Sequence, residues 1–151
     1  MKNLCMSVII LVGSLCSGCA SGLIGTLPEV KDKNDASAIY IIRPYTYVSS
    51  AISAYVSFDN NDVLAIRTVE HTKFFAPSGT HTIGVRNPGF PINNIPISLI
   101  PNNRYYFRVS VGFTNFSLVP MTEEESRPYL STTEYIKIDK NERDHKPTEK
   151  E

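Results

Sequence analysis

The chain has 151 residues, of which 42% are hydrophobic, and its 15 lysines and arginines balance 15 aspartates and glutamates. This length and hydrophobic content suit one globular domain with a packed core. The net charge of zero and the lack of a basic cluster argue against a nucleic-acid partner.

The first nineteen residues have the pattern of a signal peptide, with a lysine, an apolar run over 6–12, and small residues before a cysteine. This arrangement resembles the signal of bacterial lipoproteins, in which the residues before the cysteine are small, as Ser17 and Gly18 are. The resemblance implies that 1–18 is a lipoprotein signal peptide and that Cys19 becomes a lipidated N-terminus, held on a membrane by its acyl chains. The alternatives are a plain secretory signal and an uncleaved membrane helix, although a spanning helix needs roughly 20 apolar residues and this run is shorter.

The residue after the cysteine bears on which membrane holds the anchor. In the Gram-negative lipoproteins that this signal resembles, aspartate at that place favours the inner membrane, whereas small residues allow export to the outer membrane. Ala20 therefore predicts a lipid anchor in the cell outer membrane, with the domain facing the periplasm. The outer face of the cytoplasmic membrane is the alternative, and it applies to an organism with a single membrane.

Cysteine occurs only at Cys5, Cys16 and Cys19, so none follows the predicted signal. After processing, no thiol is left for a disulfide, a thiolate metal site or a cysteine nucleophile. A domain exported to an oxidising compartment without a disulfide depends on its hydrophobic core, which about 130 mature residues supply as a single domain.

Two flanking segments lack the period of a helix or strand. Residues 19–37 combine glycines, a proline and charges, and they predict a flexible, lipid-anchored tether. Residues 139–151 carry nine charges among thirteen residues and predict a disordered tail. The β-sandwich domain is therefore expected over 38–138.

Within this domain, short β-branched and aromatic runs are separated by turn residues at the spacing of an all-β protein. In chain order, we predict strands over 39–43, 51–58, 63–68, 73–76, 80–85, 95–99, 105–113 and 135–138. The strongest pattern is 105–113, whose strict alternation predicts a central strand with one buried face. Pro96 cannot donate to a β-ladder, so 95–99 is expected at a sheet edge.

Turn residues predict how neighbouring strands connect. The asparagine pair 60–61 suits a two-residue type I′ turn. The Pro-Ser-Gly segment 77–79 suits a second hairpin, which would pair residue 81 with residue 75.

One helix is expected after the last long strand. Thr122 precedes Glu125 by three residues, which is the spacing of a capping box, and Pro128 would keep the helix short. We therefore predict an all-β fold, a seven- to eight-stranded antiparallel β-sandwich with one short helix near 122–130. An open β-barrel is the alternative.

The order of these elements resembles the domain of unknown function 2846 family of bacterial lipoproteins, which has a prealbumin-like, or transthyretin-like, sandwich. The resemblance is carried by AIYIIRP over 38–44, YVSFD over 55–59, FAPSGTHTI over 75–83 and NRYYF over 103–107. These motifs are structural, so the resemblance implies a fold and a lipid-anchored location. It carries over no catalytic activity.

Three histidines were considered as metal ligands. In the predicted hairpin, His71 would lie roughly 13 Å along the strand from the partner of His81, and His145 falls in the tail. No histidine metal site is therefore expected, and His81 is expected to pack on its strand.

A calcium loop is matched only in part. Asp59, Asn61 and Glu70 stand at the first, third and twelfth positions of such a loop, but Leu64 replaces its glycine. Asp59 and Asp62 are instead expected to bond turn amides. We therefore predict no metal.

Catalytic motifs are missing as well. The chain has no Gly-x-Ser-x-Gly sequence and no glycine-rich loop between a strand and a helix. We therefore expect no enzyme activity and no cofactor.

The residue types most suggestive of binding are tyrosine and arginine, which are enriched at interaction hot spots. They predict one exposed surface made by Tyr45, Thr46 and Tyr47 together with Arg104, Tyr106 and Arg108. The alternative is ordinary cross-strand pairing on a solvated face.

Two functions are consistent with these features. The first is a non-enzymatic, membrane-anchored cell-envelope module that binds a protein or glycan, with 95–99 as the candidate edge for strand addition. The second is a structural or stress-related envelope lipoprotein that supports a larger assembly. A pocket lined by aromatic residues would favour the first.

Overall fold

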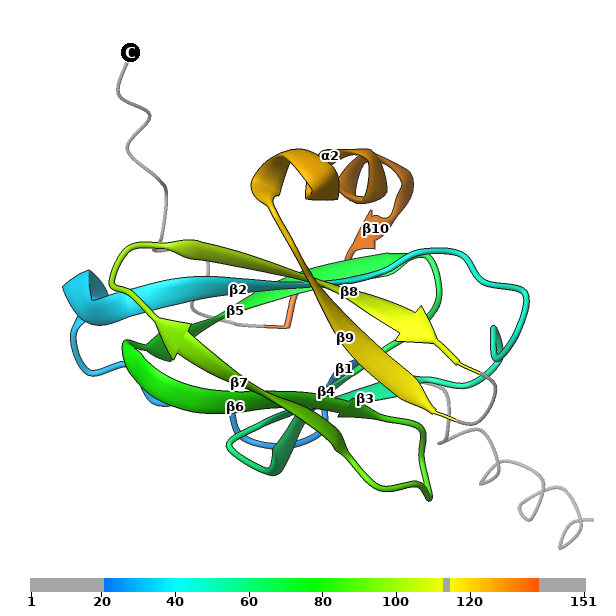
Figure 1. The fold of residues 1–151 in the computed structure, drawn as a ribbon, viewed down its shortest axis with the longest axis horizontal. Helices are drawn as coiled ribbons and strands as arrows, with labels where there is room; N and C mark the ends of the chain where they lie inside the picture. The colour runs from blue at the N-terminus through cyan, green and yellow to red at the C-terminus, as the bar shows by residue number, and fades with distance from the viewer. Residues whose placement is uncertain (1–20, 113–114, 139–151) are drawn as a thin grey trace, which may run out of the picture.

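The computed structural model describes residues 21–112 and 115–138, which form two five-stranded β-sheets packed face to face (Figure 1). The predicted signal, Cys19 and the predicted tail over 139–151 lie outside the described residues. The sheets do not close into a barrel, so the predicted all-β sandwich is confirmed and the open barrel is not the fold.

Ten strands make up the two sheets. The first sheet has the order β1 (Gly22–Leu23), β4 (Asn61–Ile66), β3 (Ala54–Phe58), β6 (Gly79–Arg86) and β7 (Asn93–Leu99). The second has the order β10 (Glu134–Tyr135), β5 (Glu70–Pro77), β2 (Ala36–Arg43), β8 (Arg104–Val111) and β9 (Phe116–Met121). A 3-10 helix, η1 (Lys33–Asp35), precedes β2, and α-helix α2 (Glu123–Thr132) packs against the second sheet.

The core lies between the two sheets. Ile39 and Ile41 of β2 and Val56 of β3 are fully buried, because every second side chain of a strand points to the same face and these point inward. The ring of Phe58 from the first sheet meets Phe74 from the second edge to face, with 6.0 Å between centroids. Fully burying one such side chain stabilises the fold by about 1.5–3 kcal/mol relative to exposure.

Two strand pairings are parallel, which corrects the prediction of a purely antiparallel sandwich. Strand β8 runs parallel to β2, with Ile39 opposite Tyr105, and β10 runs parallel to β5. Parallel neighbours need a long connection, and strands β3 to β7 supply it between β2 and β8.

Strand β8 has a neighbour on each side, which confirms the predicted interior position. Residue 113 of the predicted strand lies outside the described residues. Strand β9 was not predicted, because Pro120 interrupts its pattern.

The segment 77–79 carries the chain from one sheet to the other, so the predicted hairpin is wrong. Strand β5 belongs to the second sheet and β6 to the first, and His81 therefore does not have its expected partner. The N–H of Ser78 donates to the carbonyl oxygen of Asp35 at 3.0 Å. Gly79 has φ +125°, a conformation that glycine adopts without strain. This local turn chemistry fits a hairpin and a corner equally well.

The turn between β3 and β4 comes one residue earlier than predicted. Asp59 and Asn60 have positive φ of 48° and 64°, and Phe58 pairs with Asn61. These values define a two-residue type I′ turn. The register shifts between the pairs Val56–Leu64 and Ser57–Asp62, where Val63 of β4 has no partner in β3. The earlier position of the turn places Asp59 in the turn itself, beside strand β6.

Helix α2 begins at the predicted capping box. The Thr122 hydroxyl accepts the N–H of Glu125 at 3.2 Å, and the Glu125 carboxylate accepts the N–H of Thr122 at 2.8 Å. Pro128 does not end the helix, which continues to Thr132. The Ser131 hydroxyl donates to the carbonyl oxygen of Pro128 at 2.9 Å. Among the described residues, no helix has the length and apolar content needed to cross a membrane.

Residues 22–25 pair with β4, whereas the sequence predicted a flexible tether over 19–37. Strand β1 pairs with β4, with Gly22 opposite Ala65. The N–H groups of Ile24 and Gly25 then donate to the carbonyl oxygen of Val63 at 3.1 and 3.2 Å. A pairing of two residues has no period in the sequence, so it could not be predicted from the pattern.

A buried arginine holds the loop that follows β2. Arg43 is fully buried, and its guanidinium donates to the carbonyl oxygens of Ile66 at 2.8 Å and Ser49 at 2.9 Å. The guanidinium also lies 5.0 Å from the centre of the Phe116 ring. Burial lowers the pKa of Arg43 to about 10, partly offset by Glu70, so the side chain is charged at neutral pH.

Candidate functional site

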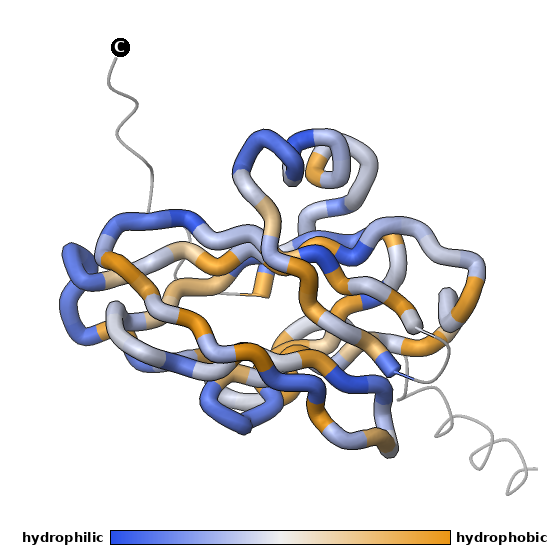
Figure 2. Tube along the Cα trace, in the orientation of Figure 1, coloured by the Kyte–Doolittle hydropathy of each residue, from blue (hydrophilic) through white to orange (hydrophobic). Residues whose placement is uncertain are grey.

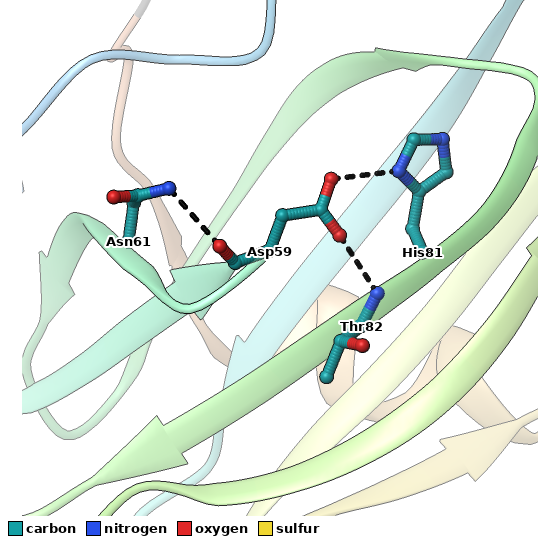
Figure 3. A network of polar contacts seen from close by, with 4 residues as sticks. All are labelled: Asp59, Asn61, His81 and Thr82. Carbon is teal, nitrogen blue, oxygen red and sulfur yellow. Dashed lines mark hydrogen bonds and ion pairs between the residues drawn. The ribbon is translucent and has the colours of Figure 1, made fainter.

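Asp59 and His81 form a polar pair beside a groove (Figure 3). Oδ2 of Asp59 lies 2.8 Å from Nδ1 of His81, and Oδ1 accepts the N–H of Thr82 at 2.9 Å. The N–H of Asp59 donates to the carbonyl oxygen of Thr82 at 2.8 Å, and the side-chain amide of Asn61 donates to the carbonyl oxygen of Asp59 at 3.0 Å. Both the backbone and the carboxylate of Asp59 are therefore fixed.

The hydrogen bonds of this pair favour an ionised carboxylate. Partial burial raises the pKa of Asp59, but the hydrogen bonds from His81 and the Thr82 amide outweigh it, so the net pKa is lower than usual. The His81 ring packs on Phe58 with 4.8 Å between centroids. Its Nε2 is buried and has no hydrogen-bond partner within the described residues. Leaving such an atom unpaired costs about 1–3 kcal/mol.

The groove lies between the N-terminal segment and the β3–β4 hairpin and has a volume of about 530 Å³. Its lining combines apolar and acidic side chains, among them Leu27, Pro28, Glu29, Phe58, Asp59 and Asp62. The Asp62 carboxylate is held in an ion pair by Arg86 of β6. A volume of this size is typical of small-ligand sites, and a fixed polar pair beside apolar walls is their usual composition.

The Asp59–His81 pair lacks the third member of a nucleophilic triad. In such a triad, a serine, threonine or cysteine gives its proton to the second ring nitrogen of the histidine. No hydroxyl bonds to Nε2 of His81 in residues 21–112 and 115–138. Those residues also contain no group of three His, Cys, Asp or Glu side chains placed to hold a metal ion.

The other residues considered as metal ligands lie apart. His71 belongs to the second sheet and His81 to the first, so the hairpin geometry used to separate them was wrong. Nδ1 of His71 lies 2.9 Å from the Thr133 hydroxyl, and burial lowers the pKa of His71. The Glu70 carboxylate accepts the Ser21 hydroxyl at 2.6 and 2.8 Å. His145 lies outside the described residues.

The tyrosines and arginines predicted to share one surface are split between two places. Tyr45, Thr46 and Tyr47 lie in the loop after β2, whereas Arg104 begins β8. Because β2 and β8 are parallel, the end of one strand and the start of the other lie at opposite ends of the sheet.

The remaining members of that predicted surface are covered. Tyr106 is only 5% exposed, and its ring stacks on Tyr40 with 4.7 Å between centroids. The guanidinium of Arg108 lies 5.6 Å from the centre of the Tyr129 ring on α2. Helix α2 therefore packs over residues that alternation alone placed on an open face.

Strand β7 is an edge of the first sheet, as Pro96 predicted. Thr82 directs its N–H and C=O toward Asp59, on the β3 side of β6. Pro96 lies opposite Thr82, so its backbone points away from β6, toward the open edge. The N–H that proline lacks is one that an added strand would need, which opposes strand addition at 95–99.

Strand β9 has the same protection at the edge of the second sheet. The N–H of Gly112 donates to the carbonyl oxygen of Asn115 at 2.8 Å, so Phe116 and, by alternation, Pro120 direct their backbones outward. The outward carbonyl oxygen of Phe116 accepts the side-chain amide of Asn93, from β7, at 3.3 Å. Both neighbouring edges therefore carry an outward proline.

Comparisons of this chain with family models, curated proteins and solved structures found no match. The candidate site is therefore interpreted from its own geometry.

Proposed function

We propose that this chain is a non-enzymatic, membrane-anchored lipoprotein of the cell envelope, attached through lipid on Cys19, whose sandwich binds an envelope protein or glycan. The observation that carries the anchor is the signal pattern ending at Cys19. The proposed location is the periplasm-facing side of the outer membrane, and the outer face of the cytoplasmic membrane is the alternative. The resemblance to the domain of unknown function 2846 family belongs to the same proposal.

The groove beside Asp59 and His81 supports the binding role. It combines the fixed, half-exposed carboxylate of Asp59 with the apolar side chains of Leu27 and Pro28 within one recess. Strand addition at β7 is a poorer route to a partner, because Pro96 removes an outward N–H at the middle of that edge. We therefore place the ligand in the groove.

A structural or stress-related role in a larger assembly is the second candidate. It is favoured by the two outward prolines, Pro96 and Pro120, because a domain with protected edges can stand beside others without pairing. A ligand in the groove is not required for this role.

The anchor is tested by growing cells with labelled palmitate and fractionating their membranes. We expect Cys19→Ala to lose the label and leave the outer-membrane fraction, whereas the matched variant Cys16→Ala keeps both. Unchanged fractionation of Cys19→Ala, with no label on the native chain, would contradict the lipoprotein and support an uncleaved helix.

The groove is tested by photo-crosslinking in intact cells. A crosslinking residue in place of Glu29, on the groove, should capture a partner that one in place of the exposed Glu124, on α2, does not. His81→Phe retains a ring to pack on Phe58 but removes both ring nitrogens and with them the bond to Asp59, so it should weaken capture. Equal capture from both positions, or no effect of His81→Phe, would favour the structural role.

A further inference from the structure

The first described residues lie at one particular end of the sandwich. Strand β1 runs antiparallel to β4 with Gly22 opposite Ala65, so the chain leads back toward Cys19 at the end where β4 finishes. The Ser21 hydroxyl bonds to Glu70, the first residue of β5, at the same end. Three peptide steps separate Cys19 from Gly22, and they span at most about 11 Å.

Two loops at this end are uncharged and expose apolar side chains. The strand directions place the β2–β3 loop, residues 44–53, and the β6–β7 loop, residues 87–92, at the end where β4 finishes, and we call it the loop end. Neither loop contains a charged residue. In them, Tyr47 is 87% exposed, Val48 54% and Phe90 48%.

The opposite end of the sandwich, which we call the polar end, is richer in charged and polar residues, and Ile100 in the β7–β8 loop is its strongly exposed apolar side chain. It carries η1 with Lys33 and Asp35, the Asp59–Asn60 turn, and Arg104 at the start of β8. Figure 2 shows hydrophilic colour over η1 at one end and stretches of hydrophobic colour within both loops at the other, with hydrophobic colour also in the β7–β8 connection beside η1. The two ends therefore suit different surroundings.

The longer loop is held in place. The guanidinium of Arg43 donates to the carbonyl oxygen of Ser49, and the Thr46 hydroxyl donates to the carbonyl oxygen of Val48 at 3.1 Å. A loop fixed in this way loses little conformational freedom when it contacts a second surface, so its exposed side chains are prepared for binding.

We propose that the loop end rests on the phospholipid bilayer that holds the anchor, with Tyr47, Val48 and Phe90 inserted at the level of the headgroups. This inference rests on lipidation at Cys19. The bilayer is the occupant because the short link keeps Gly22, where the chain enters the sandwich from the loop end, within about 11 Å of the lipidated residue. Tyrosine and phenylalanine suit the boundary between water and hydrocarbon, where an aromatic ring meets the acyl chains.

The orientation has a consequence for the groove. The Asp59–His81 pair lies at the polar end, six residues of β4 away from the loop end, or roughly 20 Å at the rise of a strand. With the loop end on the membrane, the groove faces away from the lipid. It is then open to a partner in the envelope.

The test places a fluorophore at each end of the full, processed chain. With Cys19 lipidated, Val48→Cys supplies the single thiol at the loop end, and Lys33→Cys supplies a matched one at the polar end. Both proteins are labelled with an environment-sensitive dye and reconstituted in vesicles of phosphatidylethanolamine and phosphatidylglycerol that contain a nitroxide-labelled lipid. We expect several-fold stronger quenching at residue 48 than at residue 33, and this difference should fall in the Tyr47→Ser, Phe90→Ser variant.

Each other outcome has a distinct meaning. Equal quenching at the two positions, in protein that floats with the vesicles, would overturn the orientation and leave the anchor intact. Protein that does not float would instead refute lipidation. A dye at residue 48 that is shielded but not quenched by the nitroxide, with crosslinks between chains, would replace the bilayer by a second copy of this chain.

Discussion

Replacing Arg43 by methionine should destabilise the domain without removing much volume from it. The side chain is fully buried, and its two hydrogen bonds join the end of β4, at Ile66, to the loop residue Ser49. Hydrogen bonds to a charged group contribute about 1.5–3 kcal/mol each. Methionine would leave both carbonyl oxygens without this donor.

Two effects reduce the total destabilisation expected from losing these two hydrogen bonds. The buried Nε of Arg43 has no partner in the described part of the chain, so some of its desolvation is uncompensated, and the carbonyl of Ser49 keeps the N–H of Ile52 at 3.1 Å. We therefore expect Arg43→Met to lower the free energy of unfolding by about 2–4 kcal/mol. At a urea dependence of about 2 kcal/mol/M, the midpoint would fall by roughly 1–2 M.

Urea unfolding followed by circular dichroism measures this change, with Arg67→Met as the matched control. Arg67 is exposed in the turn between β4 and β5, and its substitution should shift the midpoint little. A midpoint for Arg43→Met within experimental error of the native chain would refute the reasoning. In that case, the two carbonyl bonds would contribute no more than the cost of burying the charge.

Three further predictions concern the N-terminal segment, the polar pair and the helix. A β-carbon at Gly25 would overlap the carbonyl oxygen of Asp62, so Gly25→Ala should release the segment and speed its cleavage in limited proteolysis; a native rate would contradict the ordered pairing. The folded-state pKa of Asp59 is lowered, so its stabilising effect is present above about pH 4 and is lost as the pH falls through the folded pKa. Asp59→Asn should therefore lower stability at neutral pH and flatten its acid dependence, as measured by thermal unfolding from pH 3 to 7, and an unchanged slope would argue against the bond to His81. Thr122→Ala should cost about 0.5–2 kcal/mol through loss of the helix cap, and an unchanged urea midpoint would contradict the capping box.

The sequence predicted most strands because burial of one face leaves a period of two. The run 105–113 shows this best, since its alternating residues match β8, where Phe107 and Val109 are buried. The capping box likewise predicted where α2 begins, because its hydrogen bonds connect neighbours in the chain.

What could not be predicted depends on contacts between distant segments. The Pro-Ser-Gly segment 77–79 has the same chemistry in a hairpin and in a corner, so His81 was assigned to the wrong partner and its bond to Asp59 was missed. The alternation of β8 could not show that α2 would pack over Arg108. Strand β1 is held by an edge that is remote in the chain, and nothing in its own residues marks the pairing.

The outward prolines of β7 and β9 acquire a further meaning on a surface. Lipid-anchored chains diffuse in two dimensions and share one orientation, so their open sheet edges meet side by side at the same height far more often than in solution. Pro96 and Pro120 lie on those edges and remove a donor from each. Under the anchoring proposed here, crowding on the membrane would bring these domains together without fusing their sheets.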